Sequence, residues 1–327
     1  MNILVVGGAG YIGSHMVKLL LDSQSQVVTL DNLSNGHADA VLGGKLVQGD
    51  LSNRALLDEL FKTHSFDGVM HFASFIQVGE SVRDPSIYYA NNVSCTLNLL
   101  DAMRRHNVRN FVFSSTAAIF GEPQRTPIDE EHPKNPINPY GRSKWMVEQV
   151  LEDYERAYGI KSVCLRYFNA AGAHPAGILG ERHNPETHLI PLVLQVASGK
   201  RPFIDVYGRD YDTPDGTAIR DYIHVSDLCD AHLLAIRKLL SGGENAAYNL
   251  GNGNGFSVLE VIAAVENVTG KNVTVRHSPR RPGDSARLVA DSALARSKLG
   301  WNPKYASLET IIEHAWQWEK SHISFHK

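Results

Sequence analysis

A tyrosine and a lysine stand four positions apart in the stretch NPYGRSKWMVEQ, residues 138–149. The residues after Pro139 are compatible with a helix, so Tyr140 and Lys144 would lie one turn apart on a common face. A phenol can accept a proton when its pKa is lowered, and a nearby ammonium group lowers it. Taken alone, however, the pair is most simply an exposed phenol and a solvated lysine, because such pairs recur by chance.

A glycine-rich segment near the start of the sequence has the spacing of a dinucleotide-binding turn. The apolar run ILVV leads into GGAGYIGS, where Gly7, Gly10 and Gly13 form GxxGxxG. Such a turn lets backbone approach a diphosphate, and the following helix offers free N–H groups. Asp31 ends the next apolar run, where a carboxylate accepts hydrogen bonds from ribose hydroxyls and repels a 2′-phosphate. The segment predicts NAD rather than NADP; the alternative use of the glycines is tight helix–strand packing.

Three hydroxyl residues, Ser114, Ser115 and Thr116, end another apolar run shortly before Tyr140. At a shared sheet edge, a hydroxyl, a phenol and an ammonium group can converge on a nicotinamide ring. Lowering a phenol pKa by about 3 units requires roughly 4 kcal/mol. A unit charge about 5.5 Å away contributes roughly 3 kcal/mol at an effective dielectric near 20, and oxidised nicotinamide adds a second positive charge. The pattern therefore predicts Tyr140 as a proton acceptor activated by Lys144.

The segments around these residues alternate between two periodicities. The strand-like runs are ILVV, VVTL, LVQ, GVMHFA, FVFSS and SVCLRYF, and the helix-like segments span residues 12–21, 54–62, 88–105 and 140–158. Apolar strands linked by helices predict an α/β fold with a doubly wound parallel sheet of the Rossmann type. After Ala170 this rhythm breaks. We therefore expect an NAD-binding domain over residues 1–173, and a smaller α/β substrate-binding domain over residues 174–327.

The composition narrows the function classes further. The 327 residues are 43% hydrophobic and 20% charged with a net charge of −3, which is typical of a globular protein and not of a nucleic-acid binder. Cys95, Cys164 and Cys229 form no CxxC motif, which favours a reducing compartment, by default the cytoplasm. The 15 histidines show no HExxH spacing, so we expect no metal. There is neither a basic leader nor a bilayer-length apolar run, so we expect no membrane association.

Longer motifs identify a resemblance. The chain is similar to the UDP-glucose 4-epimerase family of the extended short-chain dehydrogenase/reductase superfamily. The similarity covers nearly the whole chain, and it is carried by the motifs GGAGYIG, DNLSNG, HFAS, VGES, YYANNV, YGRSK, RYFNAAGAHP, HLIPLV, DGTAIRDYIHV, YNLGNGNGFSV and RRPGD. The later motifs are not general to the superfamily, so the resemblance is specific.

The resemblance implies a reaction and three catalytic residues. Tyr140 is the expected base, Lys144 lowers its pKa and holds the nicotinamide ribose, and Thr116 contacts the sugar hydroxyl. Tightly held NAD takes hydride from carbon 4 of the nucleotide sugar, the 4-keto sugar turns over, and hydride returns to the other face. This would interconvert UDP-galactose and UDP-glucose in galactose metabolism.

The resemblance also implies the binding residues and a homodimer. The expected cofactor contacts, besides Tyr140 and Lys144, are Gly7, Gly10, Tyr11, Ile12, Gly13, Asp31, Asn32, Asn35, Gly36, Asp50, Leu51, Phe72, Ala73, Asn91, Ser114 and Phe168. The expected UDP-sugar contacts, besides Thr116 and Tyr140, are Asn169, His188, Leu189, Tyr207, Arg220, Arg281, Asp284 and Leu288. Guanidinium groups suit a diphosphate because they pair with its oxygens. The homodimer would form through helices near residues 88–105 and 140–158.

Ile76 departs from the family pattern, and Leu288 stands at a position where members of the family differ. Ile76 stands where the family often has a lysine near the cofactor diphosphate, so either NAD affinity is weaker or other groups compensate. Leu288 stands at the position whose bulk controls acceptance of an N-acetyl group, and leucine is smaller than the tyrosine found in restricted members. Measurable turnover of N-acetylated sugars is therefore one expectation; a wall residue without a gating role is the other.

Other functions stay open. The closest alternative is an epimerase that acts on UDP-N-acetylglucosamine or on UDP-pentoses. A sugar-nucleotide dehydratase typically needs an acidic pair directly after the threonine, and Ala117 and Ala118 occupy those positions. An NAD-sensing regulator that had discarded chemistry would have little reason to keep Tyr140, Lys144 and Thr116 together.

Overall fold

The computed structural model describes residues 1–281 and 283–323; Pro282, within the RRPGD motif, and residues 324–327 lie outside the described residues. The strands are β1 (Asn2–Val6), β2 (Gln26–Asp31), β3 (Lys45–Gln48), β4 (Gly68–His71), β5 (Asn110–Thr116), β6 (Lys161–Tyr167), β7 (Asn169–Ala171), β8 (Ile204–Tyr207), β9 (Ile219–Arg220), β10 (Tyr222–His224), β11 (Ala246–Leu250), β12 (Phe256–Ser257), β13 (Val275–Ser278) and β14 (Arg287–Leu288). The α-helices are α1 (Tyr11–Asp22), α2 (Arg54–Thr63), α3 (Val78–Arg83), α4 (Pro85–Tyr88), α5 (Cys95–Arg105), α6 (Pro139–Tyr158), α7 (Leu189–Ala197), α8 (Val225–Leu240), α9 (Val258–Thr269) and α10 (Leu308–Ile323). Short 3-10 or π-helical turns are η1 (Ala38–Ala40), η2 (Tyr89–Ser94), η3 (Ala117–Phe120) and η4 (Ala295–Leu299). Among the described helices, none is long and apolar enough to cross a bilayer.

A seven-stranded parallel sheet forms the centre of the larger part of the molecule. Its strand order is β11-β6-β5-β4-β1-β2-β3, and every neighbouring pair is parallel. The order reverses between β1 and β4, and ligands of such sheets bind at the carboxyl edge beside this switch point. The predicted doubly wound Rossmann-type fold is therefore confirmed.

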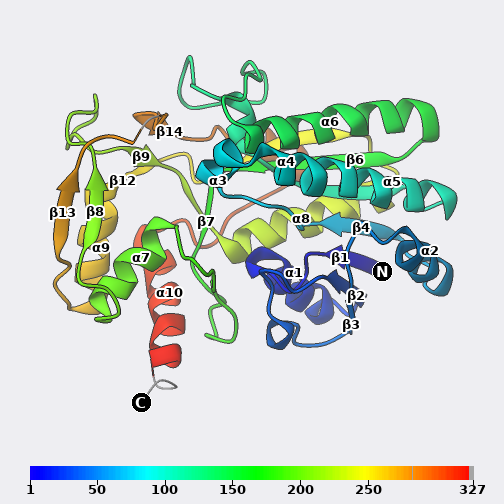
Figure 1. The fold of residues 1–327 in the computed structure, drawn as a ribbon, viewed down its shortest axis with the longest axis horizontal. Coiled ribbons are helices and arrows are strands. Elements are labelled where there is room, and N and C mark those ends of the chain that lie inside the picture. The colour runs from blue at the N-terminus through cyan, green and yellow to red at the C-terminus, as the bar shows by residue number, and fades with distance from the viewer. Residues whose placement is uncertain (282, 324–327) are drawn as a thin grey trace.

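Helices cover both faces of this sheet (Figure 1). On one face, α1 packs beside α8, and their apolar side chains join those of the strands in one buried cluster. On the other face, α2, α5 and α6 contribute to a second buried cluster that includes Leu57, Leu99 and Val147. Strand residues such as Val5 and Leu4 belong to opposite clusters, which explains why the strands are apolar on both faces.

The helix that carries Tyr140 and Lys144 begins and ends as the sequence predicts. The Asn138 side chain accepts a hydrogen bond from Gly141 N at 2.8 Å, Pro139 occupies the first turn, and Gly159 ends the helix in a left-handed conformation. The single helix predicted for residues 88–105 differs: α4, the π-helical η2 and α5 follow one another. The Asn92 side chain in η2 bonds to the Phe75 backbone and to Ser143, which ties this turn to its neighbours.

The smaller part of the molecule combines β8 and β13 with α7, α9 and α10, which share a third apolar cluster (Figure 1). Two short sheets, β12-β9-β14 and β10-β7, lie outside the main sheet. The chain then crosses back, because α8 and β11 belong to the larger part. A single boundary between residues 173 and 174 therefore leaves the edge strand β11 on the wrong side of the division.

Candidate active site

The glycine turn after β1 has no room for side chains. Gly7 has a φ of +78°, and a Cβ there would lie 2.5 Å from Ala73 N, while one on Gly13 would overlap Gly7 O. Gly10 begins α1 without a side-chain cap, so the amide groups of Tyr11 and Ile12 face no competing side-chain acceptor at the cap. This close-packed turn fits a diphosphate at the helix N-terminus.

Asp31 ends β2 beside this turn. Its two carboxylate oxygens accept hydrogen bonds from Ala9 N at 2.9 Å and Leu33 N at 2.8 Å. Gly36 lies against the same carboxylate, and a Cβ there would be 2.9 Å from Asp31 Oδ1, whereas Asn35 is exposed. Each oxygen has a second lone pair, so the carboxylate can also accept bonds from ribose hydroxyls.

Asp50 lies beyond β3 and contacts the loop after Asp31. It accepts hydrogen bonds from Asn32 Nδ2 at 2.7 Å and Ser52 N at 2.8 Å. The bonds from Ser52, with that from Asn32, lower the pKa of the Asp50 carboxyl. Leu51 beside it is buried. The structure thus brings Asn32, Asp50 and Leu51 together at the end of the sheet where an adenine ring is expected.

The segment after β4 borders the glycine turn from the other side of the switch point. The amides of Phe72 and Ala73 both donate to Val6 O, at 2.8 and 3.2 Å. Asn91, on η2, is half-buried and donates to Asn92 Oδ1 at 2.9 Å. Phe72 and Ala73 therefore line the same carboxyl edge as Gly7, as expected.

The three residues expected to be catalytic meet where β5 ends and α6 begins. Lys144 is buried and donates from Nζ to the Ser114 carbonyl at 2.8 Å, with Nζ 4.8 Å from the centre of the Phe113 ring. The Thr116 hydroxyl accepts a bond from Ala118 N at 3.1 Å. Because α6 starts beside this strand end, Tyr140, Lys144 and Thr116 come from adjoining elements and meet at one edge.

The electrostatics of this group differ in one respect from the prediction. Burial raises the pKa of the Tyr140 phenol, and a hydrogen bond with Thr116 acts in the opposite direction. The direction is opposite to the expected lowering because burial outweighs that bond. Burial also lowers the pKa of Lys144 to about 7, while the Glu148 carboxylate acts to raise it. Lowering the pKa of the Tyr140 phenol below its ordinary value therefore requires positive charge beside it.

A buried polar network behind the catalytic residues was not foreseen from the sequence. Arg166 on β6 forms a two-point ion pair with Glu148, with Nη2–Oε2 at 2.5 Å and Nε–Oε1 at 3.1 Å. Glu148 also accepts a bond from Ser115 Oγ at 2.5 Å. Glu148 lies one turn after Lys144 on α6. This i,i+4 spacing is the one sequence signal that places Glu148 on the same helix face as Lys144. The network fixes β5, β6 and α6 relative to one another.

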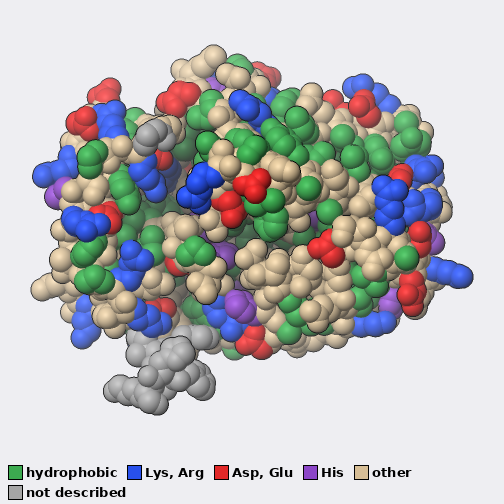
Figure 2. All heavy atoms as spheres, in the orientation of Figure 1, with side chains coloured by type: hydrophobic (Ala, Val, Ile, Leu, Met, Phe, Trp, Pro, Cys, Tyr) green, Lys and Arg blue, Asp and Glu red, His purple; other side chains and the backbone are tan. Residues whose placement is uncertain are grey.

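The expected diphosphate contacts gather in the smaller part of the molecule. Asp284 lies 2.9 Å from Arg281 Nε and 3.6 Å from Arg220 Nη2, and the Arg281 guanidinium lies 4.7 Å from the centre of the Tyr207 ring. Arg220 also donates to the Ser285 carbonyl. Figure 2 shows charged side chains around a hollow between the two parts of the molecule. The structure therefore brings together two segments that are far apart in sequence, one with Tyr207 and Arg220 and the other with Arg281 and Asp284.

Leu288 connects this group to the catalytic edge. It pairs with Arg220 across β14 and β9, and it packs with Phe168 against a small apolar cluster that includes Ile119 and Phe120. These two residues lie in η3, directly after Thr116. Asn169 begins β7 and donates from Nδ2 to the Asp221 carbonyl at 2.9 Å. Leu288 and Phe168 thus lie close to the catalytic strand end.

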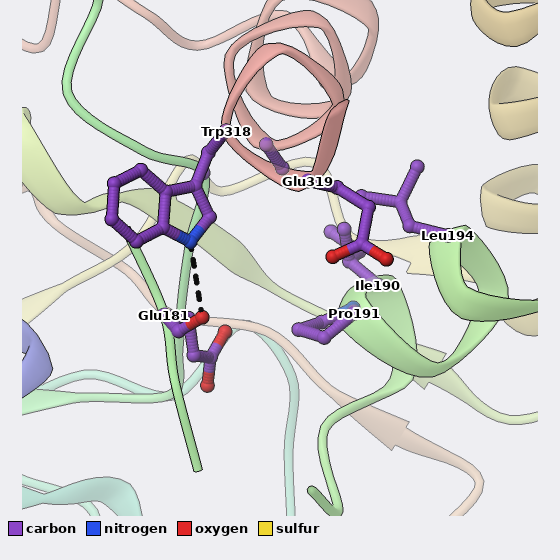
Figure 3. A pocket seen from close by; sticks show the side chains of 8 residues that line it. Glu181, Ile190, Pro191, Leu194, Trp318 and Glu319 are labelled. Carbon is purple, nitrogen blue, oxygen red and sulfur yellow. Dashed lines mark hydrogen bonds between the residues drawn. The ribbon is translucent and has the colours of Figure 1, made fainter. Parts of the chain in front are cut away.

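His188 and Leu189, two of the expected UDP-sugar contacts, lie at the start of α7 beside a cluster of glutamate and histidine side chains. Leu189 is the first residue of α7, and the His188 Nδ1 atom lies 2.7 Å from Glu181 Oε1 and 3.1 Å from Glu186 Oε1. His183 belongs to the same cluster. The spacing ExHxxExH within residues 181–188 is the sequence signal for this cluster, and it differs from the HExxH spacing of a single metal-binding helix. A pocket between α7 and α10 borders Glu181, and it does not include Tyr140, Lys144 or Thr116 (Figure 3).

The fold and these residues define a Rossmann-type dinucleotide-binding enzyme with a tyrosine–lysine pair at the carboxyl edge of its sheet. The chain belongs to the NAD dependent epimerase/dehydratase family, which it matches over residues 3–251.

Similar proteins extend this assignment. A UDP-glucose 4-epimerase of Halalkalibacterium halodurans is 54% identical over 322 residues, covering 98% of this chain and 96% of that protein. The crystal structure of the Brucella ovis UDP-glucose 4-epimerase in complex with NAD is 51% identical, with a TM-score of 0.95 over 96% and 97% of the two chains. The Bifidobacterium longum UDP-glucose 4-epimerase in complex with NAD+ and UDP is 40% identical, with a TM-score of 0.94 over 99% of each chain. The resemblance to this epimerase family is confirmed.

Proposed function

We propose that the protein interconverts UDP-galactose and UDP-glucose by NAD-dependent oxidation and re-reduction at carbon 4 of the sugar. The observation that carries the proposal is the meeting of Tyr140, Lys144 and Thr116 at the same sheet edge as the close-packed glycine turn. The full-length similarity to UDP-glucose 4-epimerases supports the choice of reaction.

NAD fits the residues present and supplies the hydride acceptor and donor. We assign its diphosphate to the N-terminus of α1, where Gly7 and Gly13 leave only backbone in reach. Asp31 would accept the ribose hydroxyls, and Asp50 with Leu51 would border the adenine. Lys144 would hold the nicotinamide ribose through its ammonium group, which already donates to the Ser114 carbonyl.

Tyr140 would accept the proton of the sugar 4-hydroxyl during oxidation at carbon 4 and return it during re-reduction, with bound NAD supplying the hydride acceptor and donor. Thr116 orients the hydroxyl by a hydrogen bond. Because burial raises the Tyr140 pKa, its deprotonation depends on positive charge nearby. Lys144 and oxidised cofactor are the groups that supply this charge in the proposal.

We assign the UDP portion to the charged group in the smaller part of the molecule. Arg220 and Arg281 would pair with the diphosphate, exchanging their contacts with Asp284 for phosphate oxygens. Tyr207, Asn169, Leu189 and His188 complete the proposed contacts. The smaller part, which comprises residues 174–327 without β11, would then hold the nucleotide. The larger part would hold the cofactor.

We also propose that the protein is a cytoplasmic homodimer formed through α5 and α6. Met146 and Tyr158 on α6 are large apolar side chains that are 42% and 40% exposed. A second copy of the chain would bury such residues. Size-exclusion chromatography with light scattering should give twice the mass of one chain; a monomer would contradict this proposal and leave the assigned reaction unaffected.

The reaction is tested by incubating the purified protein with UDP-galactose and with UDP-N-acetylgalactosamine separately, without added cofactor. Product sugars are resolved by chromatography, and the bound nucleotide is identified after acid extraction. We expect conversion of UDP-galactose to UDP-glucose and NAD(H) as the bound nucleotide. NADP as the main nucleotide, or accumulation of a dehydrated sugar, would contradict the proposal.

A further inference from the structure

Four side chains that can bind a metal converge between β7 and α7. They are Glu181, His183, Glu186 and His188, and each offers one ligand atom within 4.8 Å of all the others. Two imidazoles and two carboxylates make a ligand set typical of zinc and related first-row divalent cations. No residue of the cluster belongs to the proposed Tyr140–Lys144–Thr116 group, and His188 is the one member that is also a proposed UDP-sugar contact.

The spacing of these atoms matches a four-coordinate ion. Metal–ligand bonds of about 2.0 to 2.1 Å in a tetrahedron place neighbouring ligand atoms about 3.4 Å apart. Glu181 Oε1 lies 3.0 Å from His183 Nδ1 and 2.7 Å from His188 Nδ1. Glu186 lies 3.7 Å from His183 Nδ1, through Oε2, and 3.1 Å from His188 Nδ1, through Oε1. Since one ligand atom from each residue lies within 4.8 Å of all the others, the widest pair would close by up to about 1.4 Å when an ion binds.

The cluster also has ligand atoms whose bonding is incomplete. The Glu181 side chain is only 6% exposed, and its Oε1 atom is buried without a hydrogen bond. His183 Nδ1 is likewise buried without a well-aligned hydrogen bond, although it lies at the ion-pair distance of 3.0 Å from Glu181 Oε1. The two atoms therefore meet at ion-pair distance without an aligned hydrogen bond, an arrangement that a shared cation would also satisfy. A metal binds imidazoles in their neutral form, and a divalent cation bound in this way would balance the two negative charges of the carboxylates.

Backbone contacts hold the carboxylates in place. The amides of Thr187 and His188 donate to Glu186 Oε1 at 2.7 and 2.8 Å. The Glu181 carbonyl accepts a bond from Trp318 Nε1 on α10 at 3.3 Å, as Figure 3 shows. Such outer contacts fix the orientation of metal ligands.

We propose that Glu181, His183, Glu186 and His188 form a structural site for a zinc-class divalent cation. The ion would join the segment before α7 to its surroundings. The His183 ring lies 6.3 Å from the ring of Tyr11, the first residue of α1, and the Tyr11 hydroxyl donates to the Gly172 carbonyl at 2.7 Å. The site therefore links the start of α1, where the cofactor diphosphate is assigned, to α7 and α10. It takes no part in hydride transfer.

The site is tested on tag-free protein with its cofactor bound. The protein is stripped with a chelator, dialysed against Zn2+ and analysed for metal by mass spectrometry, and Co2+ is added separately as a spectroscopic probe. We expect one Zn2+ per chain, a rise in Tm with Zn2+, and the intense visible absorption of four-coordinate Co2+. Each of His183→Gln and Glu186→Gln should weaken Zn2+ binding at least about 100-fold.

The matched control is His277→Gln, which removes an exposed histidine on β13 and should leave binding unchanged. Zinc binding that survives both ligand variants, or the weak absorption of six-coordinate Co2+, would overturn the proposal. Equal Tm values with and without Zn2+, and no stoichiometric metal, would show that the cluster is an ion-pair network only. If the ligand variants lose their cofactor through misfolding, the Co2+ spectrum of the unaltered protein still decides the question.

Discussion

The two parts of the proposed active site are built in opposite ways. The cofactor side uses backbone and buried groups, such as the Gly7 turn and the Lys144 ammonium bonded to a strand carbonyl. The substrate side uses charged side chains at its surface, such as Arg281, whose side chain is 59% exposed. A rigid side suits repeated hydride transfer at one place, while charged side chains on the other side can exchange partners when a diphosphate enters.

The largest expected effect lies at the centre of the rigid side. Tyr140→Phe should lower turnover of UDP-galactose by about 100- to 10,000-fold, because the proton acceptor is lost while the ring remains. Cofactor content and Tm should stay unchanged. The measurement is the initial rate of UDP-glucose formation at saturating substrate.

Tyr158→Phe is the matched control, since it removes an exposed hydroxyl at the far end of the same helix. Its turnover should equal that of the unaltered protein. A Tyr140→Phe enzyme within a few fold of normal turnover would show that another group is the base.

The second prediction compares the ion pairs of the two sides. Glu148→Leu should lower the free energy of unfolding by about 3 to 5 kcal/mol, because it leaves the Arg166 charge buried without its partner. Asp284→Asn, which removes the partner of the exposed Arg281, should change it by less than about 1 kcal/mol. Denaturant unfolding at saturating NAD measures both.

The double variant Glu148→Leu with Arg166→Met removes both charges and should recover most of the lost stability. If the double variant is as unstable as Glu148→Leu alone, loss of the Ser115 contact or of packing, rather than an uncompensated charge, explains the effect.

These contrasts also show what the sequence could predict. The glycine turn, Asp31 and the helix of Tyr140 are local patterns, and the sheet edge brings them together by a general rule. The network of Glu148 and Arg166 depends on which strands are neighbours, which no local pattern specifies. The same holds for β11, because its return to the main sheet requires α8 to pack beside α1.

The third prediction uses pH to test how deeply the rigid side is buried. Burial, with a smaller effect of Lys144, lowers the pKa of His71 on β4 to about 3. An unfolded histidine has its pKa near 6.5, so the unfolded state binds more protons between about pH 6.5 and pH 3. Stability contributed by neutral His71 is therefore full above pH 6.5 and falls as the pH drops towards 3.

His71→Gln should make the free energy of unfolding fall less steeply between pH 7 and pH 4.5, while His277→Gln on the exposed β13 should not. Denaturant titrations at the two pH values give the slopes. Parallel curves for His71→Gln and the unaltered protein would mean that His71 gains a proton without cost.

The fourth prediction concerns Leu288, which joins the two sides. Leu288→Tyr should reduce the efficiency for UDP-N-acetylgalactosamine relative to UDP-galactose, because added bulk beside η3 costs about 1 to 3 kcal/mol when an acetamido group must also fit. This corresponds to about a 5- to 150-fold change in the ratio of kcat/KM values. Leu294→Tyr, at an exposed position, is the control. An unchanged ratio would leave Leu288 as a wall residue without a gating role.

The smallest expected effect tests whether the rigid side relies on backbone alone. Ile76 is 41% exposed in the segment between β4 and α3, where the family often has a lysine. Ile76→Lys should tighten NAD binding by only about 2- to 5-fold, because an ammonium group at an exposed position contributes less than about 1 kcal/mol. Val82→Lys, on the exposed face of α3, adds the same charge at a different position and should leave affinity unchanged.

The measurement is NAD affinity in protein freed of nucleotide, at two salt concentrations. A gain that shrinks at high salt would mean that the side chain reaches the diphosphate and that Ile76 had weakened the site. No gain at either concentration would mean that the Gly7 turn and the N-terminus of α1 already balance the diphosphate charge, which is the compensated alternative.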